Sequence, residues 1–158
     1  MQARDIKVHE NYNSRTLDND VALIRIDPIT FTDEILPICL PDADSTEDFV
    51  GELATTVGWG STREGGPVSD VLNEVDVTVL SNEGCGSYPN GYITSTMICA
   101  GEPRGGKDAC SGDSGGELEI HQRQSFHRNK SLQTDGRKKR YYILSISLMR
   151  AHSSGLVH

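Results

Sequence analysis

One glycine-rich stretch of this chain has the residue types and spacing that nucleophilic catalysis requires. It reads Asp108-Ala109-Cys110-Ser111-Gly112-Asp113-Ser114-Gly115-Gly116. Glycines admit backbone angles closed to other residues and keep bulk away from an incoming substrate, so Ser114 can stand on a tight turn. They also leave backbone N–H groups free to point at one spot, as a developing oxyanion needs. The stretch therefore predicts a serine nucleophile, and an ordinary serine in a glycine-rich turn is the alternative.

The elements that must position Ser114 are predicted to be short β-strands. Residues 4–9 and 75–79 alternate between polar and apolar side chains, which is the pattern of a half-buried strand. Residues 21–26 and 97–101 are short apolar runs of strand length. Turn signals separate these segments, and helical periodicity is almost absent apart from one short turn at residues 81–84, so we expect an all-β sandwich or barrel. A further strand places four residues on one of its sides: Leu53, Thr55, Val57 and Trp59.

The charge of the chain changes sign near its end. Residues 1–120 hold 7 Lys or Arg and 22 Asp or Glu, a net charge of -15, whereas residues 121–158 hold 8 and 1, a net charge of +7. An acidic body argues against nucleic acid as a partner, because phosphate contacts need a basic face. No apolar run approaches the ~20 residues of a membrane-spanning helix, so we expect no membrane partner. The basic segment is interpreted as a divergent tail, disordered or an artefact of the gene model.

Several further motifs occur in a consistent order along the chain. Together with the stretch around Ser114 they resemble the chymotrypsin-like (trypsin family) serine endopeptidases over residues 4–118. Asp20 lies 94 residues before Ser114, close to the family spacing of roughly 93. The motifs are Asp20-Val21-Ala22-Leu23-Ile24, Pro37-Ile38-Cys39-Leu40-Pro41, Gly58-Trp59-Gly60 and Met97-Ile98-Cys99-Ala100-Gly101.

The resemblance implies part of a two-barrel Greek-key fold, incomplete at both ends. Residues 1–120 would form a partial peptidase domain, with the end of the first barrel and the connector at 1–40 and the second barrel at 41–120. It also implies a secreted protein that needs no cofactor or metal, although the chain carries no signal peptide. None of its four cysteines has the C-x-x-C spacing of a zinc or redox site.

For the site residues, the resemblance implies acyl transfer. Ser114 would be the nucleophile, Asp20 would orient a catalytic histidine, and the N–H groups of Gly112 and Ser114 would form the oxyanion hole. Asp108, six residues before Ser114, would lie at the floor of the specificity pocket and select Arg or Lys in protein and peptide substrates. Protease inhibitors would be further partners. A strand-start cap for Asp20 and a solvated loop aspartate for Asp108 are the alternatives.

The resemblance gives two further assignments. Asp113 would pair with the amino terminus released by zymogen cleavage, and an ordinary turn aspartate is the alternative. Cys85 and Cys99 would form a disulfide within the second barrel. Another family disulfide would fall at Ala54 and Ile120, where both cysteines are absent together.

The chain departs from the family pattern in its histidines. The catalytic histidine should lie roughly 45 residues before the aspartate, upstream of Met1. His9 lies 11 residues before Asp20, lacks the family context and is interpreted as a surface residue. The remaining histidines, at 121, 127, 152 and 158, lie in the divergent tail. Because the base is missing and incomplete barrels leave unpaired strand edges, we expect the chain alone to be an unstable, inactive fragment of a serine endopeptidase. A non-catalytic homologue acting as a binding module, or a truncated product without function, are the alternatives.

Overall fold

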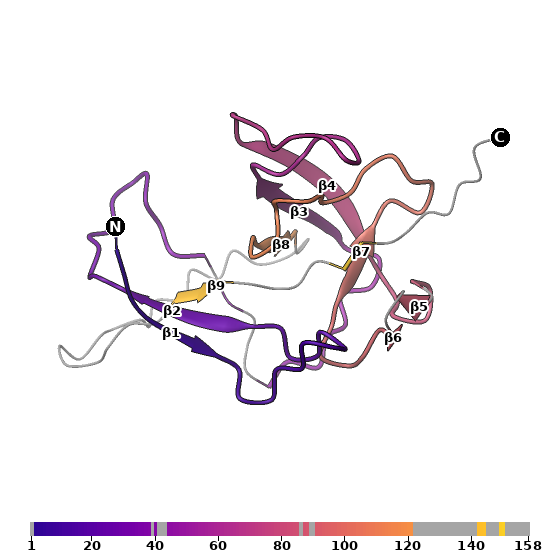
Figure 1. The fold of residues 1–158 in the computed structure, drawn as a ribbon, viewed down its shortest axis with the longest axis horizontal. Coiled ribbons are helices and arrows are strands. Elements are labelled where there is room, and N and C mark those ends of the chain that lie inside the picture. Colours follow the sequence, from indigo (N-terminus) through magenta and orange to yellow (C-terminus); the bar gives the residue numbers. More distant parts are fainter. Residues whose placement is uncertain are drawn as a thin grey trace.

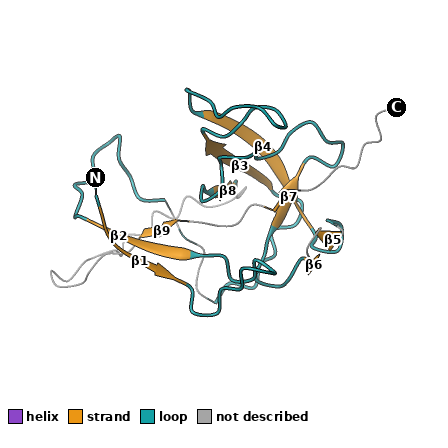
Figure 2. Ribbon diagram, viewed as in Figure 1, coloured by secondary structure: helices purple, strands orange, loops and turns teal. Residues whose placement is uncertain are grey.

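The fold, taken from a computed structural model, consists of strands and loops. The structure describes residues 2–38, 40, 44–85, 87–88, 91–121, 142–144 and 149–150. These residues contain no α-helix, as Figure 2 shows, so the all-β prediction is confirmed. No helix that could cross a membrane is found in them either. The strands are β1 (Ala3–Val8), β2 (Ala22–Ile26), β3 (Leu53–Gly58), β4 (Asn73–Leu80), β5 (Ser87–Tyr88), β6 (Gly91–Tyr92), β7 (Cys99–Gly101), β8 (Leu118–Ile120), β9 (Tyr142–Leu144) and β10 (Met149–Arg150).

The larger sheet has five strands in the order β10-β7-β4-β3-β8. Its centre is the antiparallel pair β3 and β4, which runs in register from Leu53 opposite Thr78 to Gly58 opposite Asn73. Alternation places Val77 and Val79 of β4 on one face, where they are 2% and 1% exposed. The buried core of the described residues lies against this face and consists of Ala54, Val77, Val79, Ala100 and Leu118.

The smaller sheet has three strands in the order β1-β2-β9, drawn apart from the larger sheet in Figure 1. Strands β1 and β2 form an antiparallel hairpin with a register shift between Ala3 and Asp5. Every residue of β2 is half-buried, and Ile6 and Val8 of β1 are 59% and 58% exposed. The strand predicted at residues 4–9 therefore forms, but its predicted half-burial is wrong.

Strand β3 buries the face that carries Ala54 and Thr56, opposite to the side of Leu53, Thr55, Val57 and Trp59. Ala54 and Thr56 are 0% and 3% exposed, whereas Leu53 and Trp59 are 46% and 58% exposed. The hydroxyl of Thr56 donates to the carbonyl of Glu117 at 2.8 Å, which satisfies the polar group where it is buried. Larger apolar side chains of the neighbouring strands lie on the same face, since Ala54 is directly opposite Val77 of β4 and Ile120 of β8.

The predicted division into a peptidase domain at 1–120 and a tail at 121–158 stays a prediction. Of the tail, the structure describes His121 and the strands β9 and β10. Strand β9 pairs with β2 antiparallel, and β10 pairs with β7 parallel. His127, His152 and His158 lie outside the described residues.

Candidate active site

Ser114 lies on the loop between β7 and β8, where glycines set the course of the backbone. Gly112 and Gly115 have φ angles of 105° and 89°, in the region that side chains rarely enter. The loop is closed by two backbone hydrogen bonds, from Asp113 N to Cys110 O at 3.0 Å and from Gly116 N to Asp113 O at 2.9 Å. Ser114 is exposed between them. The turn therefore presents a serine side chain to solvent on a backbone that only glycine readily forms.

Two backbone N–H groups of this loop have no hydrogen-bond acceptor among the described residues. Within the described part of the chain, neither Gly112 N–H nor Ser114 N–H donates a hydrogen bond to another residue. The backbone N–H of Asp113, the residue between them, donates a hydrogen bond to Cys110 O. Gly112 also packs tightly, since a Cβ atom there would lie 3.0 Å from Gly60 Cα and 3.1 Å from Val68 Cγ1. Any larger residue would push this donor away from the loop between β3 and β4.

Asp113 fixes the loop by turning its carboxylate inward. Oδ1 accepts a hydrogen bond from Gly60 N at 2.7 Å, and Oδ2 accepts one from Cys110 N at 2.9 Å. A Cβ atom at either Gly58 or Gly60 would overlap the Asp113 carboxylate. The two glycines of the Gly58-Trp59-Gly60 motif therefore leave the space that the Asp113 carboxylate occupies, and we call this contact the seat of Asp113. The sequence identified this motif as a landmark, but it missed its role because the contact joins residues more than 50 positions apart.

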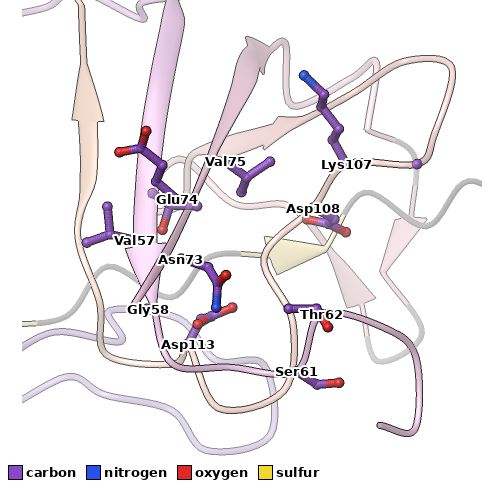
Figure 3. A pocket seen from close by; sticks show the side chains of 12 residues that line it. Val57, Gly58, Ser61, Thr62, Asn73, Glu74, Val75, Lys107, Asp108 and Asp113 are labelled. Carbon is purple, nitrogen blue, oxygen red and sulfur yellow. The ribbon is translucent and has the colours of Figure 1, made fainter. Parts of the chain in front are cut away.

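Asp108 and Asp113 line one cavity of about 200 Å³ (Figure 3). Glu74 of β4 and Lys107 also line the cavity, and both residues are exposed. Figure 3 shows the Lys107 side chain extending away from Asp108 and Asp113. The remaining lining is mostly small or polar: Thr56, Val57, Gly58, Ser61, Thr62, Asn73, Val75 and Gly106. Excess negative charge in a partly enclosed space suits a positively charged group.

Asp20 lies on the other sheet, in the turn that leads into β2. Val21 N donates to Asn19 O at 2.8 Å, which closes a tight turn with Asp20 at its apex. His9 N donates to Val21 O at 3.0 Å and joins this turn to the end of β1. Asp20 is half-buried. It does not line the cavity, and no hydrogen bond in the described residues joins it to Ser114.

The residue next to this turn is the more heavily bonded aspartate. The Asp18 carboxylate accepts hydrogen bonds from the hydroxyl groups of Thr94, at 2.7 Å, and Thr96. The Thr96 hydroxyl, and then that of Thr94, lower the pKa of Asp18 below its usual value. The sequence analysis missed these contacts, because no local pattern marks a pairing between residues 76 and 78 positions apart.

The two described histidines do not take the position of a catalytic base. His9 is exposed, and its Nδ1 accepts a hydrogen bond from Asn11 N at 3.2 Å. Nε2 of His121 lies 2.8 Å from the Thr55 hydroxyl, which donates to Asp76 at 2.6 Å. Both rings are therefore engaged in local contacts away from Ser114.

The predicted disulfide between Cys85 and Cys99 is present, with the Cα atoms 6.5 Å apart. It joins the turn that follows β4 to the start of β7. That turn is closed by a hydrogen bond from Cys85 N to Ser81 O at 3.1 Å, in the place of the predicted helical turn. The disulfide therefore fixes the segment that precedes the Ser114 loop.

Comparison with known proteins agrees with this arrangement. Residues 1–126 match the family model described as Trypsin. The chain is 44% identical over 115 residues to Trypsin-1 of Astacus astacus, which covers 72% of the chain and 47% of that relative. It is 41% identical over 119 residues to the serine proteinase stubble and also to the serine protease filzig, both of Drosophila melanogaster. Each match covers 72% of the chain, but only 15% of stubble and 7% of filzig. The chain thus spans less than half the length of each of these relatives. The chain is a member of the trypsin family of serine proteases, whose β-barrel fold agrees with its all-β architecture.

Proposed function

We propose that this chain contributes the nucleophile and the oxyanion site of a trypsin-like serine endopeptidase. The observation that carries the proposal is the Ser114 loop. Asp113 is turned inward onto Gly58 and Gly60, Ser114 is turned outward, and two neighbouring N–H groups are left for a ligand. Ser114 Oγ attacks the scissile carbonyl carbon, and the carbonyl oxygen becomes an oxyanion that the N–H groups of Gly112 and Ser114 stabilise. Each such donor contributes roughly 3–4 kcal/mol to the transition state.

Ser114 needs a base, because a hydroxyl is a weak nucleophile at neutral pH. A histidine from outside residues 1–158 takes the proton of Ser114 and later gives it to the leaving amine. Asp20 holds that histidine in the required tautomer. Water then hydrolyses the acyl-enzyme by the same proton transfers in reverse order. Without that histidine, the 158-residue chain alone is inactive.

Asp108 gives the enzyme its preference for Arg or Lys before the scissile bond. It is half-buried and lines the acidic cavity beside Asp113. A carboxylate in such a place favours a cationic side chain over an uncharged one, because opposite charges attract each other more strongly in a partly enclosed space than in open solvent. The substrates are therefore proteins or peptides with accessible Arg or Lys residues, and inhibitors that present the same side chains bind the same cavity.

Asp113 exchanges its present partners during activation. Its carboxylate now accepts hydrogen bonds from Gly60 N–H and Cys110 N–H. A new amino terminus released by cleavage of a precursor enters the acidic cavity and pairs with this carboxylate, because a full cation is a stronger partner than two amides. Such processing belongs to a secreted protease.

The test is covalent labelling of Ser114 with a fluorophosphonate. The complete protein that includes this chain should react, and Ser114→Ala should abolish the reaction. Asp108→Asn should retain labelling but lose hydrolysis of Arg-containing amide substrates, by about 100-fold or more. A complete protein whose Ser114 does not react after activation would contradict the proposal. Labelling of the 158-residue chain alone would contradict the part that assigns the base to a histidine outside it.

A further inference from the structure

A cluster of four residues joins the turn of Asp20 to the part of the chain that carries Ser114. We call it the Asp18 clamp, and it consists of Asp18, Asn19, Thr94 and Thr96. The Asp18 carboxylate accepts from both threonine hydroxyls. In the opposite direction, Asn19 N–H donates to Thr96 Oγ1 at 3.2 Å, and the two hydroxyl oxygens lie 3.1 Å apart. Thr96 therefore both gives and accepts a hydrogen bond across the contact.

On one side, the clamp rests on a turn that is anchored to the five-stranded sheet. The side-chain amide of Asn82 donates to Thr94 O at 3.0 Å and to Met97 O at 3.2 Å. Met97 N in turn donates to Thr94 O at 3.2 Å, which closes the turn. Asn82 lies two residues after Leu80, the last residue of β4, and the disulfide ties Cys85 of the same segment to the first residue of β7. The two threonines are thus held by covalent and polar contacts to the sheet that leads to Ser114.

On the other side, the clamp holds a strained loop. Leu17 and Asn19 have φ angles of 59° and 55°, and a positive φ is unusual for a leucine. Asn19 O accepts the hydrogen bond from Val21 N that forms the turn at Asp20, so the orientation of Asn19 sets that of Asp20. A backbone conformation of this kind persists only where surrounding contacts enforce it. Asp18 and Asn19 carry those contacts to Thr94 and Thr96.

We propose that the Asp18 clamp fixes Asp20 in place relative to the five-stranded sheet, with Asp18 and Thr96 acting as positioning residues for the catalytic aspartate. Its catalytic meaning rests on the proposed function. Asp20 itself makes no cross-sheet hydrogen bond in the described residues, so its neighbours supply the connection. A displaced aspartate would misplace the histidine that it holds, and small displacements of a catalytic group are costly in rate.

The test compares backbone amide exchange at Asn19 and Val21 in variants of the complete protein that includes this chain. Asp18→Ala and Thr96→Val remove the clamp, and exchange at both amides should accelerate by about fivefold or more. Thr96→Ser keeps the hydroxyl and should restore exchange to within about twofold of the unsubstituted chain. Asp27→Ala is the matched control, because it removes an exposed carboxylate that pairs with Arg4 on the same sheet and leaves the clamp intact. The amide of Val79, bonded to Glu52 O in the larger sheet, reports any global loss of structure.

Unchanged exchange at Asn19 and Val21 in Asp18→Ala, or failure of Thr96→Ser to differ from Thr96→Val, would overturn the inference. Labelling of Ser114 in the complete protein forms a second measurement, in which Thr96→Val should lower the rate by about tenfold and Thr96→Ser should not. An undiminished rate in Thr96→Val would overturn the positioning role. If Ser114 of the unsubstituted protein never reacts while the exchange pattern holds, the proposed function alone fails, and the control of the Asp20 turn by the clamp is supported.

Discussion

The two sheets of this chain hold their candidate site residues in different surroundings. The five-stranded sheet has a buried core of aliphatic side chains and a disulfide, and it positions Ser114 through the seat of Asp113 on Gly58 and Gly60. The three-stranded sheet has no fully buried residue in β1 or β2, and it positions Asp20 through hydrogen bonds of loop residues. Polar contacts hold both segments, but the loop of Ser114 is attached to a sheet with a buried core and the turn of Asp20 to a sheet in which β1 and β2 have none. A buried core is shared by many residues, so we expect most of the stability of the chain to reside in the five-stranded sheet.

A new disulfide between residues 54 and 120 should give the largest effect, because it would stabilise the five-stranded sheet further relative to the three-stranded sheet. The two residues lie directly opposite each other in β3 and β8. In the adjacent pair, His121 N donates a hydrogen bond to Leu53 O at 2.8 Å, so Ala54 and Ile120 form a pair without hydrogen bonds between them. Such a non-hydrogen-bonded pair brings Cα atoms to about 4.5 Å, within the reach of a disulfide. Ala54→Cys with Ile120→Cys should raise the free energy of unfolding by about 4 kcal/mol. Urea unfolding with and without a reductant measures this gain, and equal stability in both conditions would show that β8 does not pair with β3 as described.

Loss of the native disulfide should have the next largest effect. Cys85 and Cys99 close a loop with a sequence separation of 14, for which the chain-entropy model gives about 3 kcal/mol. Cys85→Ser with Cys99→Ser should lower stability by that amount and accelerate exchange at the Asn19 amide, because the turn of Thr94 loses an anchor. The two single variants are the controls, and each should match the double variant. Stability equal to that of the unsubstituted chain would mean that the five-stranded sheet does not depend on this bond.

Matched valine truncations in the two sheets test the difference directly. Val77→Ala removes methyl groups from a side chain that is 2% exposed and should cost about 2–3 kcal/mol. Val8→Ala on β1 removes the same groups from a side chain that is 58% exposed and should cost less than about 0.5 kcal/mol. Urea unfolding of both variants gives the comparison. Similar costs would break the claim that stability resides in the larger sheet.

The exposed ion pair between Arg4 and Asp27 should give the smallest effect, and one that depends on pH. Arg4 Nε donates to Asp27 at 2.8 Å, and this hydrogen bond lowers the pKa of Asp27. A lowered pKa contributes stability that is present above the unfolded value of about 3.9 and is lost as pH falls through the folded value. The urea midpoint of Asp27→Asn should therefore lie slightly below that of the unsubstituted chain at neutral pH and coincide with it in strong acid. A difference that grows on acidification would contradict this sign.

The sequence predicted the strands well where alternation was long enough to be read. Residues 75–79 lie in β4 and bury the valines that the pattern selected, whereas β8 was missed because Leu118-Glu119-Ile120 is too short to show a period. The alternation in β3 separated its two faces but did not show which face is buried, and the structure buries the face of Ala54 and Thr56. Patterns within one strand do not show which neighbour will lie beside it.

For the site, the sequence predicted the residues of one loop and missed those that hold it. Ser114, Gly112 and Asp113 stand together in the sequence, so their local geometry followed from glycine chemistry. The partners Gly58 and Gly60, and Thr94 and Thr96 for Asp18, lie far away in the sequence, and ordinary glycines and threonines carry no sign of such contacts. The roles of Asp20 and Asp108 stay predictions for the labelling experiments to test.

The seat of Asp113 has an optical consequence. Trp59 is the single tryptophan of the chain, it stands between the two glycines that receive the Asp113 carboxylate, and it is 58% exposed. Movement of that carboxylate away from Gly60 N–H would release the backbone on the C-terminal side of Trp59. Since the chain has a single tryptophan, we expect a change in its fluorescence to accompany such a movement, without a dye or an introduced probe.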